Sequence, residues 1–138
     1  MNPTDSGRMA KIRVLIVDDK QQVRRDLKTA LELAEGLEVV GEAADGLEAV
    51  WQAEKLNPDV VLMDLKMRDM DGFEATRHIK SRHLARGVVA LTIYNTNSVR
   101  ERAAKAGADV FIEKGTDIPS LIEAIRKAAS SGVADKLN

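Results

Sequence analysis

The chain has 138 residues, which fits one domain, and its 21 basic and 22 acidic residues leave a formal net charge of −1. This balance gives no electrostatic reason to expect that the chain binds nucleic acid directly or binds an acidic membrane. Without cysteine, a long apolar segment or an apolar N-terminal leader, the sequence excludes disulfides and thiolate chemistry and predicts a cytoplasmic protein.

Apolar runs alternate with amphipathic stretches along most of the chain. The runs predict buried strands, and the stretches between them place apolar residues at helical spacing. We expect strands over 11–17, 37–43, 59–63, 88–92 and 109–112, and helices over 21–34, 45–56, 71–82, 98–105 and 117–130. Residues 1–10 are expected to form a flexible N-terminal tail, residues 11–131 one domain, and residues 132–138 a C-terminal tail without an output domain.

Two of the predicted helices begin with the same pattern, Asp-Gly-x-Glu. Asp45 and Asp71 are therefore expected to cap these helices by accepting backbone N–H bonds. In the helix that begins at Asp45, the apolar residues Leu47, Val50 and Trp51 are expected to face inward.

Strict alternation of strands and helices favours a parallel sheet with helices on both faces. Crossovers between parallel strands are right-handed, which fixes the side on which each helix lies. Ligands of such sheets bind at the carboxyl ends of the strands. Polar residues at these ends are therefore the candidates for a functional site.

Polar side chains close or follow four of the predicted strands. Asp18 and Asp19 follow the first strand, Asp64 follows the third, Thr92 ends the fourth, and Lys114 comes just after the fifth. In a parallel sheet these positions share one edge, so three carboxylates, one hydroxyl and one ammonium group are expected to converge.

Such a cluster suits phosphoryl transfer to a carboxylate. Two unit charges about 4 Å apart repel by roughly 4 kcal/mol at an effective dielectric constant near 20, so the carboxylates need positive charge nearby. Mg²⁺ prefers hard oxygen ligands, and Lys114 adds a second positive charge. Asp64 would act as the nucleophile and become an aspartyl phosphate, with the Thr92 hydroxyl close to the phosphoryl oxygens.

Five short stretches, in this order and at this spacing, resemble the receiver domains of two-component response regulators. The resemblance covers about residues 11–130 and implies a flavodoxin-like (βα)5 fold, doubly wound, with strand order 2-1-3-4-5. The matching stretches are Val-Leu-Ile-Val-Asp-Asp (14–19), Asp-Val-Val-Leu-Met-Asp (59–64), Met-Asp-Gly-Phe-Glu (70–74), Leu-Thr (91–92) and Ala-Gly-Ala-Asp-Val-Phe-Ile-Glu-Lys-Gly (106–115).

The resemblance implies a role for each polar residue of the cluster. Asp64 would accept a phosphoryl group from a histidine kinase or a histidine phosphotransfer protein, in a reaction assisted by Lys114. Asp19 would bind Mg²⁺ directly, Asp18 would act largely through water, and the backbone carbonyl of Lys66 would be a further ligand.

The resemblance also implies a conformational switch. Thr92 would rotate toward the phosphoryl group, and the aromatic ring of Phe111 would turn inward as the following loop moves. A downstream protein would read the changed face formed by 98–105, 109–112 and 117–130. A homodimer through the last two of these elements is common in the family, although no residue of this chain specifies one.

Several residues depart from the pattern of the family. Arg68 and Gly115 stand where proline is frequent, which leaves open whether the Lys114–Gly115 peptide bond is cis. Ile93 is bulkier than the usual residue and would narrow access to the phosphate. Lys66 and Tyr94 occupy positions that tune hydrolysis of the aspartyl phosphate, and both could shield it from water, so we expect a fairly long-lived phosphorylated form.

Three other functions compete with a free-standing receiver that acts on no external metabolite. The chain could be the receiver half of a DNA-binding transcriptional regulator, because a residue other than proline after the lysine recurs in such receivers. It could be an interaction module that works without phosphorylation. A phosphatase of the haloacid dehalogenase class would need a second aspartate two residues after the nucleophile, where this chain has Lys66.

Overall fold

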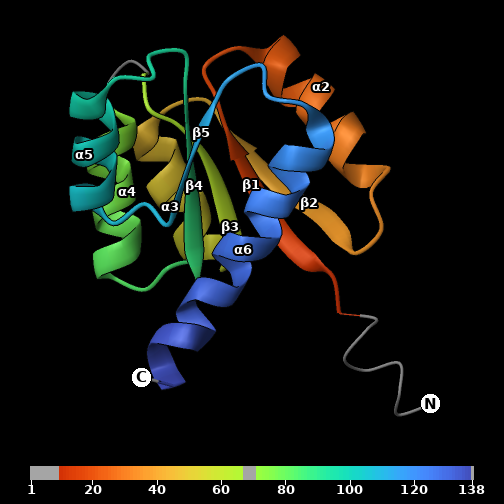
Figure 1. Ribbon diagram of the computed structural model, residues 1–138. Coiled ribbons are helices and arrows are strands. Elements are labelled where there is room, and N and C mark those ends of the chain that lie inside the picture. The colour runs from red at the N-terminus through yellow and green to blue at the C-terminus, as the bar shows by residue number, and fades with distance from the viewer. Residues whose placement is uncertain (1–9, 67–70, 138) are drawn as a thin grey trace.

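The computed structural model describes residues 10–66 and 71–137, with side chains as far as residue 131. The expected N-terminal tail, except for residue 10, and Arg68 therefore lie outside the described residues. One parallel sheet of order β2-β1-β3-β4-β5 forms the centre of the molecule, with helices on both faces (Figure 1), which confirms the predicted fold class.

Strands and helices alternate in the predicted order. None of the described helices is both long and apolar enough to span a membrane. The elements are β1 (Ile12–Val17), α2 (Gln21–Glu32), β2 (Leu37–Ala43), α3 (Gly46–Leu56), β3 (Val60–Asp64), α4 (Gly72–Ser81), β4 (Gly87–Thr92), α5 (Asn97–Ala106), β5 (Val110–Glu113) and α6 (Ile118–Leu137).

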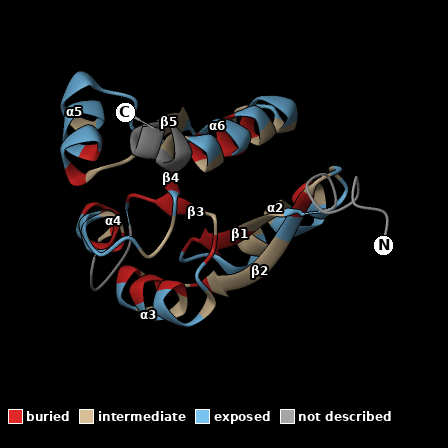
Figure 2. Ribbon diagram, turned by 90° about the horizontal axis from the view of Figure 1, so that it is seen from below, coloured by how far each residue is buried: buried red, intermediate tan, exposed pale blue. Residues whose placement is uncertain are grey.

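The sheet separates two apolar cores because successive strand residues point to opposite faces. In β1, Leu15 and Val17 pack into the core beneath α3, α4 and α5, whereas Val14 and Ile16 pack into the core beneath α2 and α6. The central strands are buried on both sides, as the red ribbon in Figure 2 shows. The apolar runs of the sequence therefore correspond to strands covered on both faces.

Parallel pairing aligns the carboxyl ends of the central strands. Val17 of β1 lies opposite Met63 of β3, and Asp64 of β3 lies opposite Leu91 of β4. The residues that follow β1 and end β3 are consequently neighbours at one rim of the sheet.

The two Asp-Gly-x-Glu patterns cap helices, as predicted. The carboxylate of Asp45 accepts a hydrogen bond from the backbone N–H of Glu48, and Asp71 accepts one from Glu74, both at 2.8 Å. Each cap satisfies a backbone donor that the first helical turn leaves free.

The prediction that Leu47 and Trp51 face inward is wrong, although Val50 is buried as expected. Leu47 is 62% exposed and Trp51 60% exposed. The side of α3 that contacts the core is made largely of small residues such as Ala49 and Ala53. Small side chains let the helix axis lie close to the sheet, and the larger residues then point outward.

The last helix is longer than predicted. It continues to Leu137, so most of the segment expected as a tail over 132–138 is helical. Ser and Gly lower helix propensity by at most about 1 kcal/mol each, which explains why Ser130, Ser131 and Gly132 do not end the helix.

The buried hydroxyl of Thr76 on α4 gives a test of the packing. It is fully buried and, among the described residues, has no hydrogen-bond partner. A buried polar group without a partner costs about 1–3 kcal/mol, so Thr76→Val is expected to raise the free energy of unfolding by about 1 kcal/mol in urea denaturation. Thr76→Ser keeps the hydroxyl and loses a methyl group, so it is expected to destabilise by about 1 kcal/mol. Equal effects of the two substitutions would contradict this assignment.

Candidate functional site

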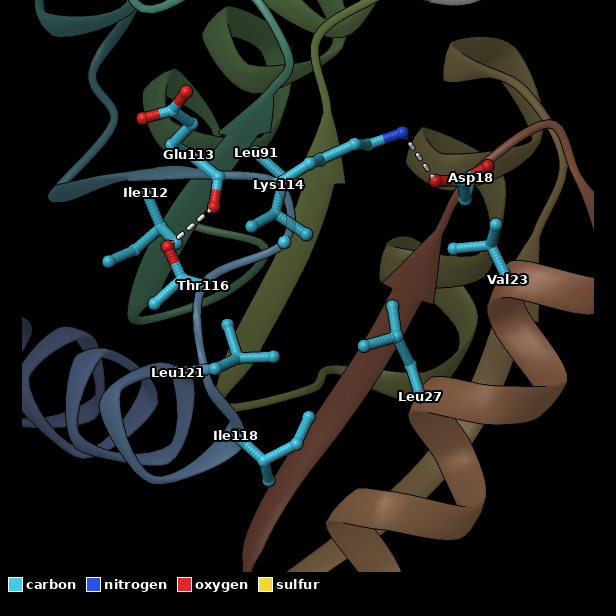
Figure 3. Close-up of a pocket in the computed structure, with 11 residues that line it drawn as sticks. Asp18, Val23, Leu27, Leu91, Ile112, Glu113, Lys114, Thr116, Ile118 and Leu121 are labelled. Atoms are coloured by element: carbon cyan, nitrogen blue, oxygen red, sulfur yellow. Dashed lines mark hydrogen bonds and ion pairs between the residues drawn. The ribbon is translucent and has the colours of Figure 1, made fainter.

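Three carboxylates meet at the rim of the sheet where the sequence places them. Asp18, Asp19 and Asp64 each have a carboxylate oxygen within 4.8 Å of the others. Lys114 reaches this cluster from the end of β5, with its Nζ atom 2.8 Å from Asp18 and 3.2 Å from Asp64 (Figure 3 shows the contact with Asp18). Asp18 and Asp64 are buried, at 1% and 3% exposure, whereas Asp19 is exposed.

Backbone donors hold the two buried carboxylates in place. Asp64 accepts the N–H of Lys66 at 3.1 Å, and Asp18 accepts the N–H of Lys20 at 2.9 Å. Arg24 donates to the carbonyl oxygen of Asp18 at 2.7 Å, a contact that the sequence patterns do not indicate. Each carboxylate therefore keeps its orientation while one of its oxygens points toward Lys114.

Gly72 allows α4 to begin directly beside the site. A Cβ atom at this position would lie 2.2 Å from the carbonyl oxygen of Asp64 and 2.6 Å from the Cα atom of Leu65. The N–H of Gly72 donates to the carbonyl of Leu65 at 3.2 Å. The glycine in the Asp71-Gly72 pattern thus has a steric reason, which is the close approach of the two backbones.

Thr92 is buried at the end of β4, and its hydroxyl takes part in a hydrogen bond. The Oγ1 atom accepts a hydrogen bond from the N–H of Tyr94 at 2.9 Å. Tyr94 also contacts Lys66, whose Nζ atom lies 3.1 Å from the phenol oxygen and 4.9 Å from the ring centroid. These two side chains connect the loops that follow β3 and β4. The neighbouring Ile93 is 61% exposed.

Burial and charge set the protonation states at the site. Burial raises the pKa of Asp64, the charge of Asp18 adds to this rise, and the Lys66 N–H and Lys114 oppose it. Burial also lowers the pKa of Lys114, but its hydrogen bond with Asp18 and the charges of Asp64 and Asp18 outweigh burial and raise it. Lys114 is therefore firmly cationic, and its ammonium group is shared by the two buried carboxylates.

This donor set fits a divalent cation with hard oxygen ligands. Burial is the main cause of the raised pKa of Asp64, and the charge of Lys114 does not fully compensate for it. Two buried carboxylates and the exposed Asp19 offer oxygens within one coordination sphere. The three aspartates therefore form a cluster that could hold a metal ion, whereas Mg²⁺ and the phosphoryl transfer stay predictions.

A mostly apolar hollow of about 320 Å³ adjoins the site between α2 and α6. Figure 3 shows Asp18 and Lys114 at one end of it and apolar side chains along its length. Its apolar lining includes Val23, Leu27 and Leu121. Asp18, which is almost completely buried, therefore lies at the end of an apolar wall.

Phe111 lies half-buried in β5 and packs against the core beneath α5. Arg100 of α5 lies over its ring, 4.9 Å from the centroid. A second arginine of α5, Arg102, lies 4.0 Å from the ring centroid of Phe73 and 3.6 Å from the carboxylate of Asp71. The sequence patterns do not indicate these arginine contacts, because they depend on how α5 packs. The role of Phe111 as a switch stays a prediction.

The peptide bond between Lys114 and Gly115 is trans, which answers the question that the sequence left open. Gly115 has a φ angle of +91°, a conformation that glycine adopts without strain.

This chain is similar to a known family of domains and to several known proteins. A family model described as the response regulator receiver domain matches residues 14–126. The response regulator protein VraR of Staphylococcus aureus (strain Mu3) is 42% identical over 118 residues, which are 86% of this chain and 56% of VraR. The chain thus spans about half the length of the curated relatives it matches.

Solved structures agree with this comparison. The response regulator domain of Thermotoga maritima CheB superposes with a TM-score of 0.80 at 34% identity, over 87% of this chain and 97% of that domain. A DNA-binding response regulator of the LuxR family from Staphylococcus aureus superposes with a TM-score of 0.79 at 27% identity, over 86% of this chain and 98% of the other.

The effect of the Asp64 charge on the stability of the folded protein can be measured. Because its surroundings raise its pKa, the charged form of Asp64 destabilises the folded protein at neutral pH, where the group is ionised in the unfolded chain. In the absence of divalent cations, Asp64→Asn is therefore expected to raise the melting temperature by a few degrees, or about 1 kcal/mol, in calorimetry at pH 7.

Asp26→Asn on the exposed side of α2 is the matched control and should change the melting temperature far less. A lower melting temperature for Asp64→Asn would mean that its ion pair with Lys114 outweighs burial, contrary to this account.

Proposed function

The chain belongs to the response regulator receiver domain family of two-component signalling, and on this premise we propose that Asp64 is its phosphoacceptor. The observation that supports this assignment is the convergence of Asp64 with Asp18, Asp19 and Lys114 at one rim of the sheet. Asp64 is buried enough to be shielded from bulk water, and it borders the exposed Asp19, where a donor can approach.

The proposed reaction moves a phosphoryl group from a histidine nitrogen to an aspartate oxygen. A carboxylate oxygen of Asp64 forms a bond to phosphorus as the phosphorus–nitrogen bond of the donor breaks, and the electron pair of that bond stays on the imidazole. Lys114, within 3.2 Å of Asp64, lies where it can meet the charge on the phosphoryl oxygens. The donor is a histidine kinase, with which this family interacts, or a histidine phosphotransfer protein.

The metal in this proposal is Mg²⁺. Asp19 and Asp64 would bind it directly, Asp18 would act largely through water, and the backbone carbonyl of Lys66 would complete the protein ligands. When bound, the ion offsets the charge of the carboxylates and of the phosphoryl oxygens. Such a receiver changes its own phosphorylation state and turns over no external metabolite, so we propose that it is a switch and not an enzyme.

The switch that we propose begins at Thr92. Its hydroxyl accepts the Tyr94 N–H, so turning toward a phosphoryl group on Asp64 would break this 2.9 Å bond and release the loop after β4. Movement of that loop would displace α5, to which Phe111 is linked through Arg100. A downstream protein would then read the face formed by α5, β5 and α6.

A second candidate function is that of a receiver within a longer DNA-binding regulator. The chain spans 56% of VraR, and one structural neighbour is described as a DNA-binding response regulator. Immunodetection of the native polypeptide in source cells tests this candidate. A band about twice the size of this chain would support it, and a band of this chain's own size would reject it.

The proposed function predicts that Asp64 can be phosphorylated. Incubation with acetyl phosphate and Mg²⁺ is expected to add the mass of one phosphoryl group to the wild-type chain, as seen by mass spectrometry of the intact protein. Asp64→Ala and addition of a chelator should each abolish the adduct.

Asp26→Ala, which removes an exposed aspartate of α2, is the control and should leave the adduct unchanged. A wild-type chain that takes up no phosphoryl group would favour the interaction module that works without phosphorylation.

The contact between Lys66 and Tyr94 leads to a prediction about the lifetime of the phosphorylated form. The two side chains bridge the loops on either side of the site, so together they would restrict the approach of water to the aspartyl phosphate. The double variant Lys66→Ala, Tyr94→Ala is expected to shorten the half-life of the phosphorylated form by about tenfold, the equivalent of about 1.4 kcal/mol. Phosphate-affinity gels after removal of the donor measure this half-life.

Lys55→Ala on α3 is the control for loss of a surface lysine. A wild-type half-life of only seconds would show that the two side chains do not shield the phosphate.

A further inference from the structure

Asp18 is held at each of its polar groups. Its N–H donates to the carbonyl of Ala43 at 3.1 Å, and its carboxylate accepts the Lys20 N–H at 2.9 Å and the Nζ atom of Lys114 at 2.8 Å. The remaining group, the backbone carbonyl oxygen, accepts a hydrogen bond from the Nη1 atom of Arg24 at 2.7 Å. The proposed function gives a role to Asp18 and to Lys114 but none to Arg24.

The side chain of Arg24 is itself fixed by a second contact. Arg24 lies in the first part of α2, which packs against β1 and β2 (Figure 1). Its Nε atom donates to the carboxylate of Glu42 on β2 at 3.0 Å, and the side chain is only 15% exposed. Two nitrogen atoms of one planar guanidinium group therefore join the carboxyl ends of two neighbouring strands.

The carbonyl that Arg24 contacts belongs to the peptide between Asp18 and Asp19. A peptide unit is planar and rigid, so this hydrogen bond fixes the direction in which the chain continues to Asp19. Asp19 is exposed, and one of its carboxylate oxygens lies within 4.8 Å of oxygens of Asp18 and Asp64. Arg24 thus controls the point from which the Asp19 side chain extends toward the other two carboxylates.

We propose that Arg24, held in place by Glu42, is a positioning residue for the divalent cation site. This inference rests on the proposed function, because it concerns the same three carboxylates. Mg²⁺ demands a nearly ideal octahedral arrangement of its ligands, so a small displacement of Asp19 weakens its binding. Loss of a group that orients metal ligands typically lowers metal affinity by about 10–100-fold.

The charge of Arg24 acts in the opposite direction. A cation close to the three carboxylates repels Mg²⁺, so removal of this charge alone would tighten Mg²⁺ binding. A residue that only anchors α2 to β2 would change the free energy of unfolding and leave Mg²⁺ binding by the folded protein unchanged. The direction in which the Mg²⁺ affinity changes therefore distinguishes positioning from charge and from anchoring.

Titration calorimetry of the unphosphorylated chain with Mg²⁺, at fixed ionic strength, measures this affinity. We expect Arg24→Ala to raise the dissociation constant about tenfold. Arg25→Ala is the matched control, because it removes the same charge from the neighbouring, exposed position of α2. Salt screens exposed charges, so the control should change the dissociation constant by less than about twofold. Urea denaturation without Mg²⁺ shows that each variant is folded in the titration.

Arg24→Lys keeps the charge and most of the aliphatic stem, so it should fold even if Arg24→Ala does not. Its single ammonium group replaces two nitrogen atoms of a planar fork, so we expect the dissociation constant to rise in this variant too. A folded Arg24 variant that binds Mg²⁺ as tightly as the wild type, or more tightly, would overturn this inference alone. A wild-type chain that binds no Mg²⁺ would overturn the proposed metal site and this inference together.

Discussion

The buried pair of carboxylates that share Lys114 is the interaction on which the site depends. Asp18 and Asp64 are almost completely buried, and the ammonium group of Lys114 contacts both of them. Burial of charge is unfavourable unless it is offset, and the raised pKa of Asp64 shows that the offset is incomplete. The fold thus holds negative charge in a place where a cation and a phosphoryl group, which bring opposite charges, can enter together.

The topology of the sheet explains how this arrangement arises from distant parts of the chain. Asp18 and Lys114 are 96 residues apart in sequence and 2.8 Å apart in space. Parallel pairing aligns the ends of β1, β3 and β4, because each crossover takes the chain back to the opposite rim and the next strand then ends at the same rim as the last. The strand ends could be predicted because each is marked by a polar residue directly after an apolar run. The helix caps at Asp45 and Asp71 could be predicted because capping is local.

Contacts that depend on packing could not be predicted in this way. Helical periodicity counts apolar residues but does not say how near the helix axis lies to the sheet, which is why Leu47 and Trp51 were expected inside. The arginine contacts of α5 depend on the same kind of information. This helix buries only Ala103 and Ala106, so its position depends partly on surface contacts such as that of Arg100 with Phe111. An element held in this way is suited to movement, as a conformational switch requires.

We propose that one cation and one phosphoryl group bind together between Asp19, Asp64 and Lys114. A crystal structure with Mg²⁺ and beryllofluoride, a mimic of the phosphoryl group, would show whether they do. We expect the mimic on the Asp64 carboxylate, in contact with Lys114 and the Thr92 hydroxyl, and Mg²⁺ bound to Asp19 and Asp64. Density for the mimic at another residue, or Lys114 turned away from it, would rule out this arrangement.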